Sequence, residues 1–270
     1  MRARLSGRVS GLLSALAALT LAACAQAQTG IAAHSTLRLP EGADGPVPAV
    51  VFLSGCGGVR EVQDVYAREA NAEGWAALIV DSHAARGIGP AGARLLVCTG
   101  LSMRGQDRAA DVFAALELLR ADPRIDAGRL ALTGWSHGGW TVLDAMASAQ
   151  AGEQGSAPFA GVRGAFVIYP YCGAIVRARR DPVGAHFPVE SLLAGRDAIA
   201  DHRACERLFE RQRASGAVIR PSVLLSEATH AFDAQDQPWD PRMRYDAGQA
   251  AEAHALFRRF LRRSSAGTAD

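Results

Sequence analysis

Residues 130–139 read Leu-Ala-Leu-Thr-Gly-Trp-Ser-His-Gly-Gly, and the expected fold follows from the order of these residue types. The apolar run at 130–132 predicts a buried strand. A helix directly after the serine is predicted by four apolar positions: Trp140, Val142, Leu143 and Met146. Between strand and helix stands a Gly-x-Ser-x-Gly pattern, in which Gly134 and Gly138 leave space where a Cβ would strike neighbouring backbone. We therefore predict that Ser136 lies on a tight, strained turn, with its hydroxyl standing clear above the sheet.

A strand, a Gly-x-Ser-x-Gly turn and a helix together are typical of the nucleophile elbow of α/β-hydrolases. The N-terminal N–H groups of the helix and the positive end of its dipole face the place where an oxyanion would form. In a chain with 28 glycines the pattern can also arise by chance, so a structural glycine turn in another α/β fold is the alternative. We expect an α/β-hydrolase fold over residues 36–263, in a single domain with a mostly parallel sheet and helices on both faces.

The remaining elements are predicted from apolar runs and from helical spacing. Further strands are expected at residues 36–40, 49–53, 75–80, 162–169, 190–195 and 222–226, and helices at 61–73, 104–121, 201–215 and 245–263. Residues 83–102 are expected to be irregular. Because this stretch follows the carboxyl end of a strand, where open α/β sheets build their sites, we expect it to line a pocket.

The composition is that of a globular protein, with 49% hydrophobic and 21% charged residues. The net charge of +2 includes Arg2, Arg4 and Arg8, so the rest of the chain is close to neutral. A near-neutral domain does not indicate a nucleic-acid partner. We find neither a zinc-type ligand cluster nor a dinucleotide fingerprint after the first strand, so we expect no metal and no organic cofactor.

The N-terminus resembles a bacterial export signal. Three arginines precede a largely apolar stretch at 9–23 that is too short to span a bilayer as a mature helix, which predicts a signal peptide over residues 1–23. The tetrapeptide that ends at Cys24 resembles a lipobox, so we expect lipidation of Cys24. Ordinary signal-peptide cleavage after residue 27 is the alternative. A tether over 24–35 and a flexible tail over 264–270 are also expected. With either kind of processing, the protein is expected to be exported, as a periplasmic or a membrane-anchored protein. The sequence does not give its oligomeric state.

Export places the cysteines where disulfides persist. With Cys24 lipidated, four cysteines remain, and they allow three pairings: Cys56, Cys98, Cys172 and Cys205. Free buried thiols are the alternative. Cys98 lies in the stretch at 83–102 and can reach back to Cys56, and that bond would brace the loop after the strand at 49–53.

That loop reads Ser-Gly-Cys-Gly-Gly at residues 54–58. A glycine-rich loop after this strand is where an α/β-hydrolase places its second oxyanion donor. The loop resembles the His-Gly-x-Gly-Gly segment of esterases, with Ser54 at the histidine position. By that resemblance the backbone N–H of Cys56 is one donor and that of His137 is the other; a plain tight turn is the alternative.

Three polar residues follow predicted strands in the order nucleophile, acid and base: Ser136, Asp197 and His230. The carboxyl ends of parallel strands meet at one rim, so these residues are expected to form one site. A serine hydroxyl needs a base to take its proton, and the base needs an acid to orient it. Asp201 or Asp181 remain alternatives for the acid.

His230 is the histidine that follows both the serine and the acid in the chain and also stands just after a predicted strand. His137 adjoins the serine but is expected to point away along its helix, and His83 lies in a loop. Asp233 is interpreted as a turn residue.

Six segments resemble the dienelactone hydrolase family, over roughly residues 35–262. They stand at positions 55–58, 81–87, 134–139, 169–172, 195–197 and 229–232. The cysteines also look like those of exported members, and a Cys172–Cys205 bond would tie two neighbouring loops at the rim; we expect this bond together with Cys56–Cys98. Dienelactone hydrolases proper carry cysteine in the elbow, whereas this chain has Ser136.

The resemblance implies a carboxylic ester hydrolase that cleaves a small ester or lactone through an acyl-enzyme. Two other functions stay open: a peptidase of the prolyl-oligopeptidase kind, which usually carries a large extra domain, and a non-catalytic surface lipoprotein that binds a ligand. Three tryptophans either line an apolar pocket or belong to the core: Trp135, Trp140 and Trp239. Arg86 or Arg94 either pairs with a substrate carboxylate or is a solvated loop residue.

Overall fold

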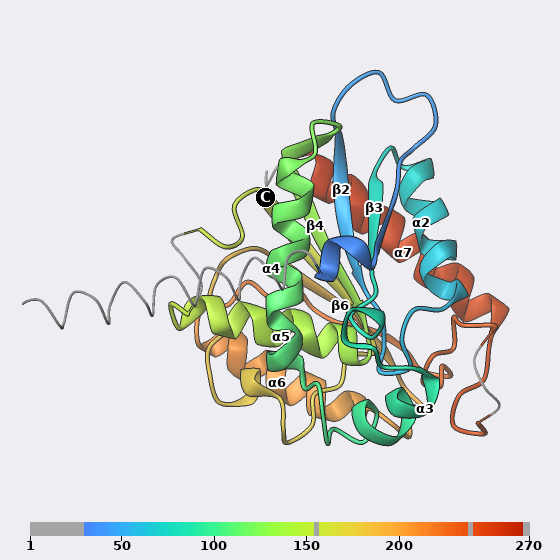
Figure 1. Ribbon diagram of the computed structural model, residues 1–270. Helices are drawn as coiled ribbons and strands as arrows, with labels where there is room; N and C mark the ends of the chain where they lie inside the picture. The colour runs from blue at the N-terminus through green and yellow to red at the C-terminus, as the bar shows by residue number, and fades with distance from the viewer. Residues whose placement is uncertain (1–29, 154–156, 237–239, 267–270) are drawn as a thin grey trace, which may run out of the picture.

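The computed structural model describes residues 30–153, 157–236 and 240–266, and within them seven strands form one sheet. The spatial order is β1-β3-β2-β4-β5-β6-β7, and every neighbouring pair is parallel except β1 with β3. The strands are β1 Ser35–Arg38, β2 Val47–Leu53, β3 Ala76–Val80, β4 Ile125–Trp135, β5 Val162–Ile168, β6 Val189–Ala194 and β7 Val223–Leu225. This single-domain sheet confirms the predicted α/β-hydrolase fold (Figure 1).

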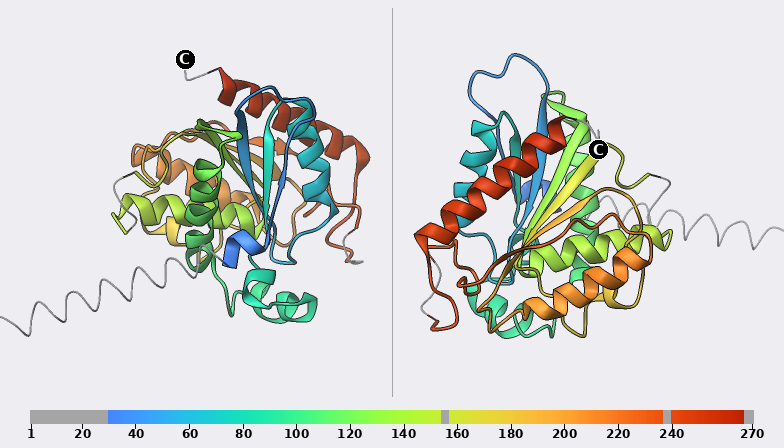
Figure 2. Two further views of the ribbon diagram at one scale, coloured as in Figure 1. Left: turned by 45° about the horizontal axis from the view of Figure 1, so that its top comes forward. Right: turned by 180° about the vertical axis from the view of Figure 1, so that it is seen from behind.

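Helices cover both faces of the sheet, as Figure 2 shows. One face carries α2 (Glu61–Ala72) and α7 (Ala247–Ser265). The other carries α4 (Gly105–Ala121), α5 (His137–Gln150) and α6 (His202–Ala214). Because each parallel strand is buried on both sides, it reads as a continuous apolar run rather than as an alternating pattern.

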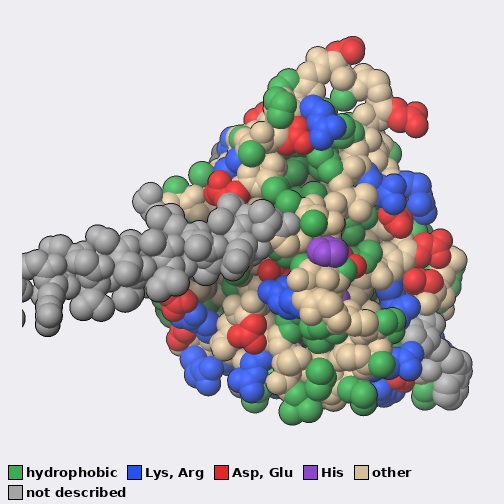
Figure 3. Space-filling view, in the orientation of Figure 1, with side chains coloured by type: hydrophobic (Ala, Val, Ile, Leu, Met, Phe, Trp, Pro, Cys, Tyr) green, Lys and Arg blue, Asp and Glu red, His purple; other side chains and the backbone are tan. Residues whose placement is uncertain are grey.

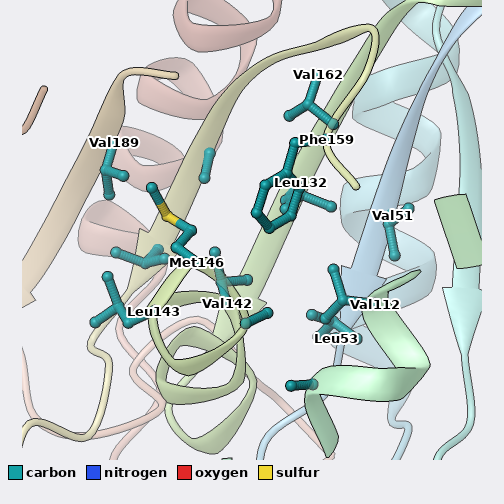
Figure 4. Packing of buried hydrophobic residues seen from close by; sticks show 14 of the residues in the cluster. Val51, Leu53, Val112, Leu132, Val142, Leu143, Met146, Phe159, Val162 and Val189 are labelled. Carbon is teal, nitrogen blue, oxygen red and sulfur yellow. The ribbon is translucent and has the colours of Figure 1, made fainter. Parts of the chain in front are cut away.

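The two layers of the core are built from alternate residues of the same strands. In β2, Ala49, Val51 and Leu53 belong to the cluster beneath α4, α5 and α6, whereas Val50 and Phe52 belong to the cluster beneath α2 and α7. Figure 4 shows the first cluster, where side chains from α4 and α5 pack against the sheet.

Several expected boundaries differ from the structure. Residues 30–33, assigned to a tether, are helical, Ile31 is only 2% exposed, and β1 begins at Ser35. Helix α7 extends to Ser265, so the first two residues of the expected flexible tail continue a helix with one buried side. These elements are set by burial against the sheet, which local composition does not show.

The stretch at 83–102 is not irregular throughout. It contains a 3₁₀ turn at Ala84–Arg86, the one-turn helix α3 (Pro90–Gly92) and a π-helical turn at Ala93–Val97. A further 3₁₀ turn lies at Arg177–Arg179. No helix in the described part of the chain is long and apolar enough to cross a membrane. The expected signal peptide and Cys24 lie outside the described residues.

Candidate active site

Ser136 stands on a sharp turn between β4 and α5. Its φ of 50° lies in the left-handed region that non-glycine residues rarely adopt, so the turn is strained. A Cβ at Gly138 would lie 1.9 Å from the carbonyl oxygen of Leu53, and one at Gly134 would lie 2.4 Å from the backbone of Gly138. Gly138 is therefore required by the close approach of β2 to the turn, and Gly134 by the close approach of the start of α5.

The structure brings Ser136, His230 and Asp197 together from three different strand ends. The Nε2 atom of His230 lies 3.0 Å from the Oγ of Ser136, and its Nδ1 lies 2.6 Å from an oxygen of Asp197. The second oxygen of Asp197 accepts hydrogen bonds from the backbone N–H groups of Ile199 and Ala200, at 2.8 and 2.7 Å. The carboxylate is thus fixed from both sides, with its side chain only 1% exposed.

Both alternative acids have other partners. Asp201 caps α6 by accepting the N–H of Arg203, and Asp181 forms an ion pair with Arg177 at 2.7 Å. Gly195, two residues before Asp197, allows the chain to pass close to the end of β7, since a Cβ there would meet the carbonyl oxygen of Ser226 at 2.5 Å.

Asp233 lies in a turn, as the sequence predicted, but it is not a surface residue. It is buried, and its carboxylate accepts hydrogen bonds from the hydroxyls of Tyr66 and Tyr169, at 2.9 and 2.6 Å, and from the indole N–H of Trp135 at 3.3 Å. Burial raises the pKa of Asp233, and its tyrosine donors oppose that shift. The ring of Tyr169 also packs on His230, so this network holds the histidine loop against the sheet.

We expect Asp233→Ala to lower the free energy of unfolding by about 3 kcal/mol, because three buried donors would lose their acceptor. Urea unfolding with the disulfides intact measures the change. Asp64→Ala is the control, since Asp64 is half-exposed and pairs with Arg38 at the surface, where a pair contributes less than about 1 kcal/mol. Equal losses in the two variants would contradict the buried network.

The loop after β2 lies directly beside the serine. A Cβ at Gly55 would be in van der Waals contact with the Cβ of Ser136, at 3.7 Å. Cys56 is tied to Cys98 by a disulfide, and the Nε2 of His83 lies 2.9 Å from the carbonyl oxygen of Cys56. Burial lowers the pKa of His83, so it is neutral near pH 7 and donates through Nε2.

Arg108, which the sequence analysis missed, connects this loop to the elbow. It is fully buried, and its Nη1 donates to the carbonyl oxygen of Ser54 at 2.9 Å and to the Nδ1 of His137 at 3.0 Å. The His137 ring therefore contacts Arg108, which holds it beneath the elbow. Burial, and then the charge of Arg108, lower the pKa of His137 well below its usual value.

Both predicted disulfides are present, Cys56–Cys98 and Cys172–Cys205. They differ in access, because Cys98 is exposed whereas Cys172 and Cys205 are buried. The first bond braces the loop beside Ser136. The second joins the loop after β5 to α6, which follows the Asp197 loop.

Mild reduction should therefore open Cys56–Cys98 first, and we expect it to lower the predicted turnover of a soluble ester by about tenfold, since the predicted oxyanion donor, the N–H of Cys56, would lose its support. Iodoacetamide labelling followed by peptide mapping identifies the reduced pair, and activity is measured before alkylation. Reoxidation should restore activity. Full activity with Cys56 and Cys98 reduced would contradict this role.

A pocket of about 110 Å³ opens beside the serine. Its lining is mainly apolar or uncharged: Cys56, Val97, Cys98, Thr99, Gly100, Ser136, His137, Trp140, Tyr171, Ile175 and Ile199. A larger hollow of about 490 Å³ lies at the amino end of β2, but its lining contains no serine, cysteine or histidine. In the described ranges no three His, Cys, Asp or Glu side chains are placed to hold a metal ion.

The tryptophans and arginines singled out in the sequence divide between core and pocket. Trp140 lines the pocket, whereas Trp135 is a core residue bonded to Asp233; Trp239 lies outside the described residues. Arg86 makes a two-point ion pair with Asp111, at 2.7 and 2.9 Å, so it is not available to a substrate. Arg94 is exposed and does not line the pocket.

Solved structures with the same fold include a dienelactone hydrolase-like promiscuous phosphotriesterase from metagenomic libraries, which superimposes with a TM-score of 0.65 at 20% identity over 85% of this chain and 98% of that one. Dienelactone hydrolase from Anabaena variabilis gives a TM-score of 0.58 at 18% identity, over 84% of this chain and 90% of that one. Est1E from Butyrivibrio proteoclasticus, with ferulic acid bound, gives 0.60 at 12% identity over 86% and 95%.

No curated protein matches the chain. The model of the dienelactone hydrolase family, however, matches residues 34–265. This range includes the seven described strands and also Ser136, Asp197 and His230. This protein is therefore a member of the dienelactone hydrolase family and a hydrolase of the ester and lactone type.

Proposed function

We propose that this protein hydrolyses carboxylic esters through an acyl-enzyme formed on Ser136. The observation that carries the proposal is the position of His230, within hydrogen-bond distance of both Ser136 and Asp197. His230 takes the proton of the serine hydroxyl as its oxygen attacks the ester carbonyl, and returns it to the leaving alkoxide. A water molecule then attacks the acyl-enzyme with the same histidine as base. Asp197 keeps the histidine proton on Nδ1 and stabilises the imidazolium.

The oxyanion is held by the backbone N–H groups of Cys56 and His137. Two observations support this role: both residues line the pocket beside Ser136, and Arg108 bonds to the segments that carry them. Arg108 is thus a positioning residue. Donors fixed in advance are effective because they need no rearrangement as charge develops.

The lining of the pocket favours an uncharged acyl group. Within the described residues no arginine lines it, the chain has no lysine, and the buried His137 is neutral near pH 7. A substrate carboxylate would enter the pocket without a partner, at a high desolvation cost. Trp140 and Tyr171 provide aromatic contact instead, and the structure of Est1E with ferulic acid supports aromatic acids as candidates.

Labelling with a fluorophosphonate tests this proposal. We expect a single adduct on Ser136 by peptide mapping, together with turnover of p-nitrophenyl esters of short or aromatic acids. Turnover of a peptide p-nitroanilide at a similar rate would indicate a peptidase. Folded protein that neither reacts with the probe nor turns over esters would indicate a ligand-binding role.

We also propose that the chain is exported and carries lipid on Cys24. The lipobox-like sequence supports this, and the two disulfides are compatible with an oxidising compartment. Wild-type protein should incorporate radiolabelled palmitate and fractionate with membranes. Cys24→Ala should do neither, and equal incorporation by both forms would exclude this site.

A further inference from the structure

Three leucines at the active-site rim are left exposed by the fold. Leu95, Leu96 and Leu101 are 68%, 46% and 74% exposed, and all belong to residues 93–101, here named the rim loop. They lie close together, because the N–H of Leu101 bonds to the carbonyl oxygen of Leu96. Figure 3 shows hydrophobic side chains along the lower edge of the molecule, where Figure 1 places α3 and the loop that follows it. Exposed apolar groups gathered in one place indicate an interaction surface.

The segment that carries these leucines is basic, and Asp81 and Asp107 flank it. From Ser82 to Gln106 the chain contains no acidic residue but three arginines: Arg86, Arg94 and Arg104. Arg86 is neutralised by Asp111, whereas Arg94 and Arg104 are exposed. A loop with leucines and arginines at its surface matches the interface of a bilayer that contains anionic phospholipids.

The rim loop is attached to the pocket. Val97, Cys98, Thr99 and Gly100 line it, and the Cys56–Cys98 disulfide fastens the loop to the segment beside Ser136. A surface that covered the three leucines would therefore lie at the pocket mouth.

The start of the described chain lies near the carboxyl ends of the parallel strands, at the same end of the sheet as the rim loop. Ser35 pairs with Val80 at the carboxyl end of β3, and the carbonyl oxygen of His34 accepts the N–H of Asp81, where the segment leading to the rim loop begins. Only residues 25–29 separate Cys24 from Gly30, a reach on the order of 20 Å. A lipid on Cys24 would thus hold this rim close to the membrane.

We infer that the rim loop docks on the surface of a bilayer containing anionic phospholipids and presents the pocket to esters dissolved in that bilayer. The docking stands on its own, whereas the choice of substrate rests on the ester hydrolysis proposed above. Leucine insertion removes apolar surface from water, and Arg94 and Arg104 meet the headgroup phosphates.

Fluorescence quenching tests the docking without any measurement of activity. The full chain is incorporated into vesicles of phosphatidylcholine and phosphatidylglycerol, with part of the former brominated on its acyl chains. Relative to wild type, Leu101→Trp should add emission that the brominated lipid quenches by about half. Val218→Trp is the control, because Val218 is 44% exposed but lies beside the amino end of β6, away from the rim. Equal quenching of the two added tryptophans would overturn the docking.

A kinetic comparison tests the consequence for the substrate. The triple variant L95S/L96S/L101S should lose about tenfold in the rate on a long-chain ester held in vesicles, while a soluble short ester reacts as with wild type. The control V218S/V223S/L224S removes exposed apolar groups elsewhere and should lose neither rate. An equal loss on both esters would overturn this assignment. It would also be overturned if light scattering showed that the wild type is a dimer and that the leucine substitutions convert it to a monomer. Inactivity of the wild type towards every ester would refute the proposed function and leave the quenching result in force.

Discussion

Ser136→Ala should reduce the turnover of a soluble aryl ester by at least about 10⁴-fold, down to the level left by binding and the proposed oxyanion donors. The reason is the hydroxyl of Ser136: its Oγ lies 3.0 Å from the Nε2 of His230, and alanine offers no atom there. The substitution should also abolish labelling by a fluorophosphonate. Initial rates and intact mass measure both effects.

The fold of this variant should be unchanged, because the turn depends on backbone contacts. The N–H of Ser136 donates to the carbonyl oxygen of Ile168, and its own carbonyl accepts the N–H of Tyr171. Thermal unfolding should therefore match wild type. Ser215→Ala is the control for activity, since Ser215 is exposed at the end of α6. A Ser136→Ala variant with activity near that of Ser215→Ala would refute the nucleophile.

Gly138→Ala should have the largest effect on stability, a loss of more than about 4 kcal/mol or a failure to fold. The added Cβ would lie 1.9 Å from the carbonyl oxygen of Leu53 and 2.9 Å from that of Ser54. Both atoms are backbone at the end of β2, which pairs with β3 on one side and β4 on the other, so neither can yield without separating the sheet. Denaturant unfolding, or soluble yield if the protein does not fold, measures the loss.

Gly89→Ala is the matched control. A Cβ there would meet no atom within 4 Å, and the residue does not need a left-handed backbone. Its stability should stay within about 0.5 kcal/mol of wild type. If Gly138→Ala were equally mild, β2 would not approach the elbow as closely as the structure has it.

Several features of this protein could be read from local sequence. The Gly-x-Ser-x-Gly turn is predictable because its glycines answer a steric demand that few other residue types can meet. Continuous apolar runs identify the central parallel strands, because burial on both faces removes the polar alternation. The meeting of Ser136, Asp197 and His230 follows from chain order and strand ends, since parallel strands align their carboxyl ends at one rim.

Other features appear only once distant segments are packed together. The turn at Asp233 could be predicted, but not its burial against Tyr66, a helix residue 167 positions away whose hydroxyl donates to its carboxylate. Arg108 lies within an ordinary helix, and its place under the elbow depends on how α4 packs against β2. The exposure of the rim-loop leucines likewise depends on which neighbours fail to cover them. Buried hydrogen bonds and exposed apolar patches involve residues that have no regular spacing in the sequence. Only the tertiary structure could therefore decide which residues take part in them.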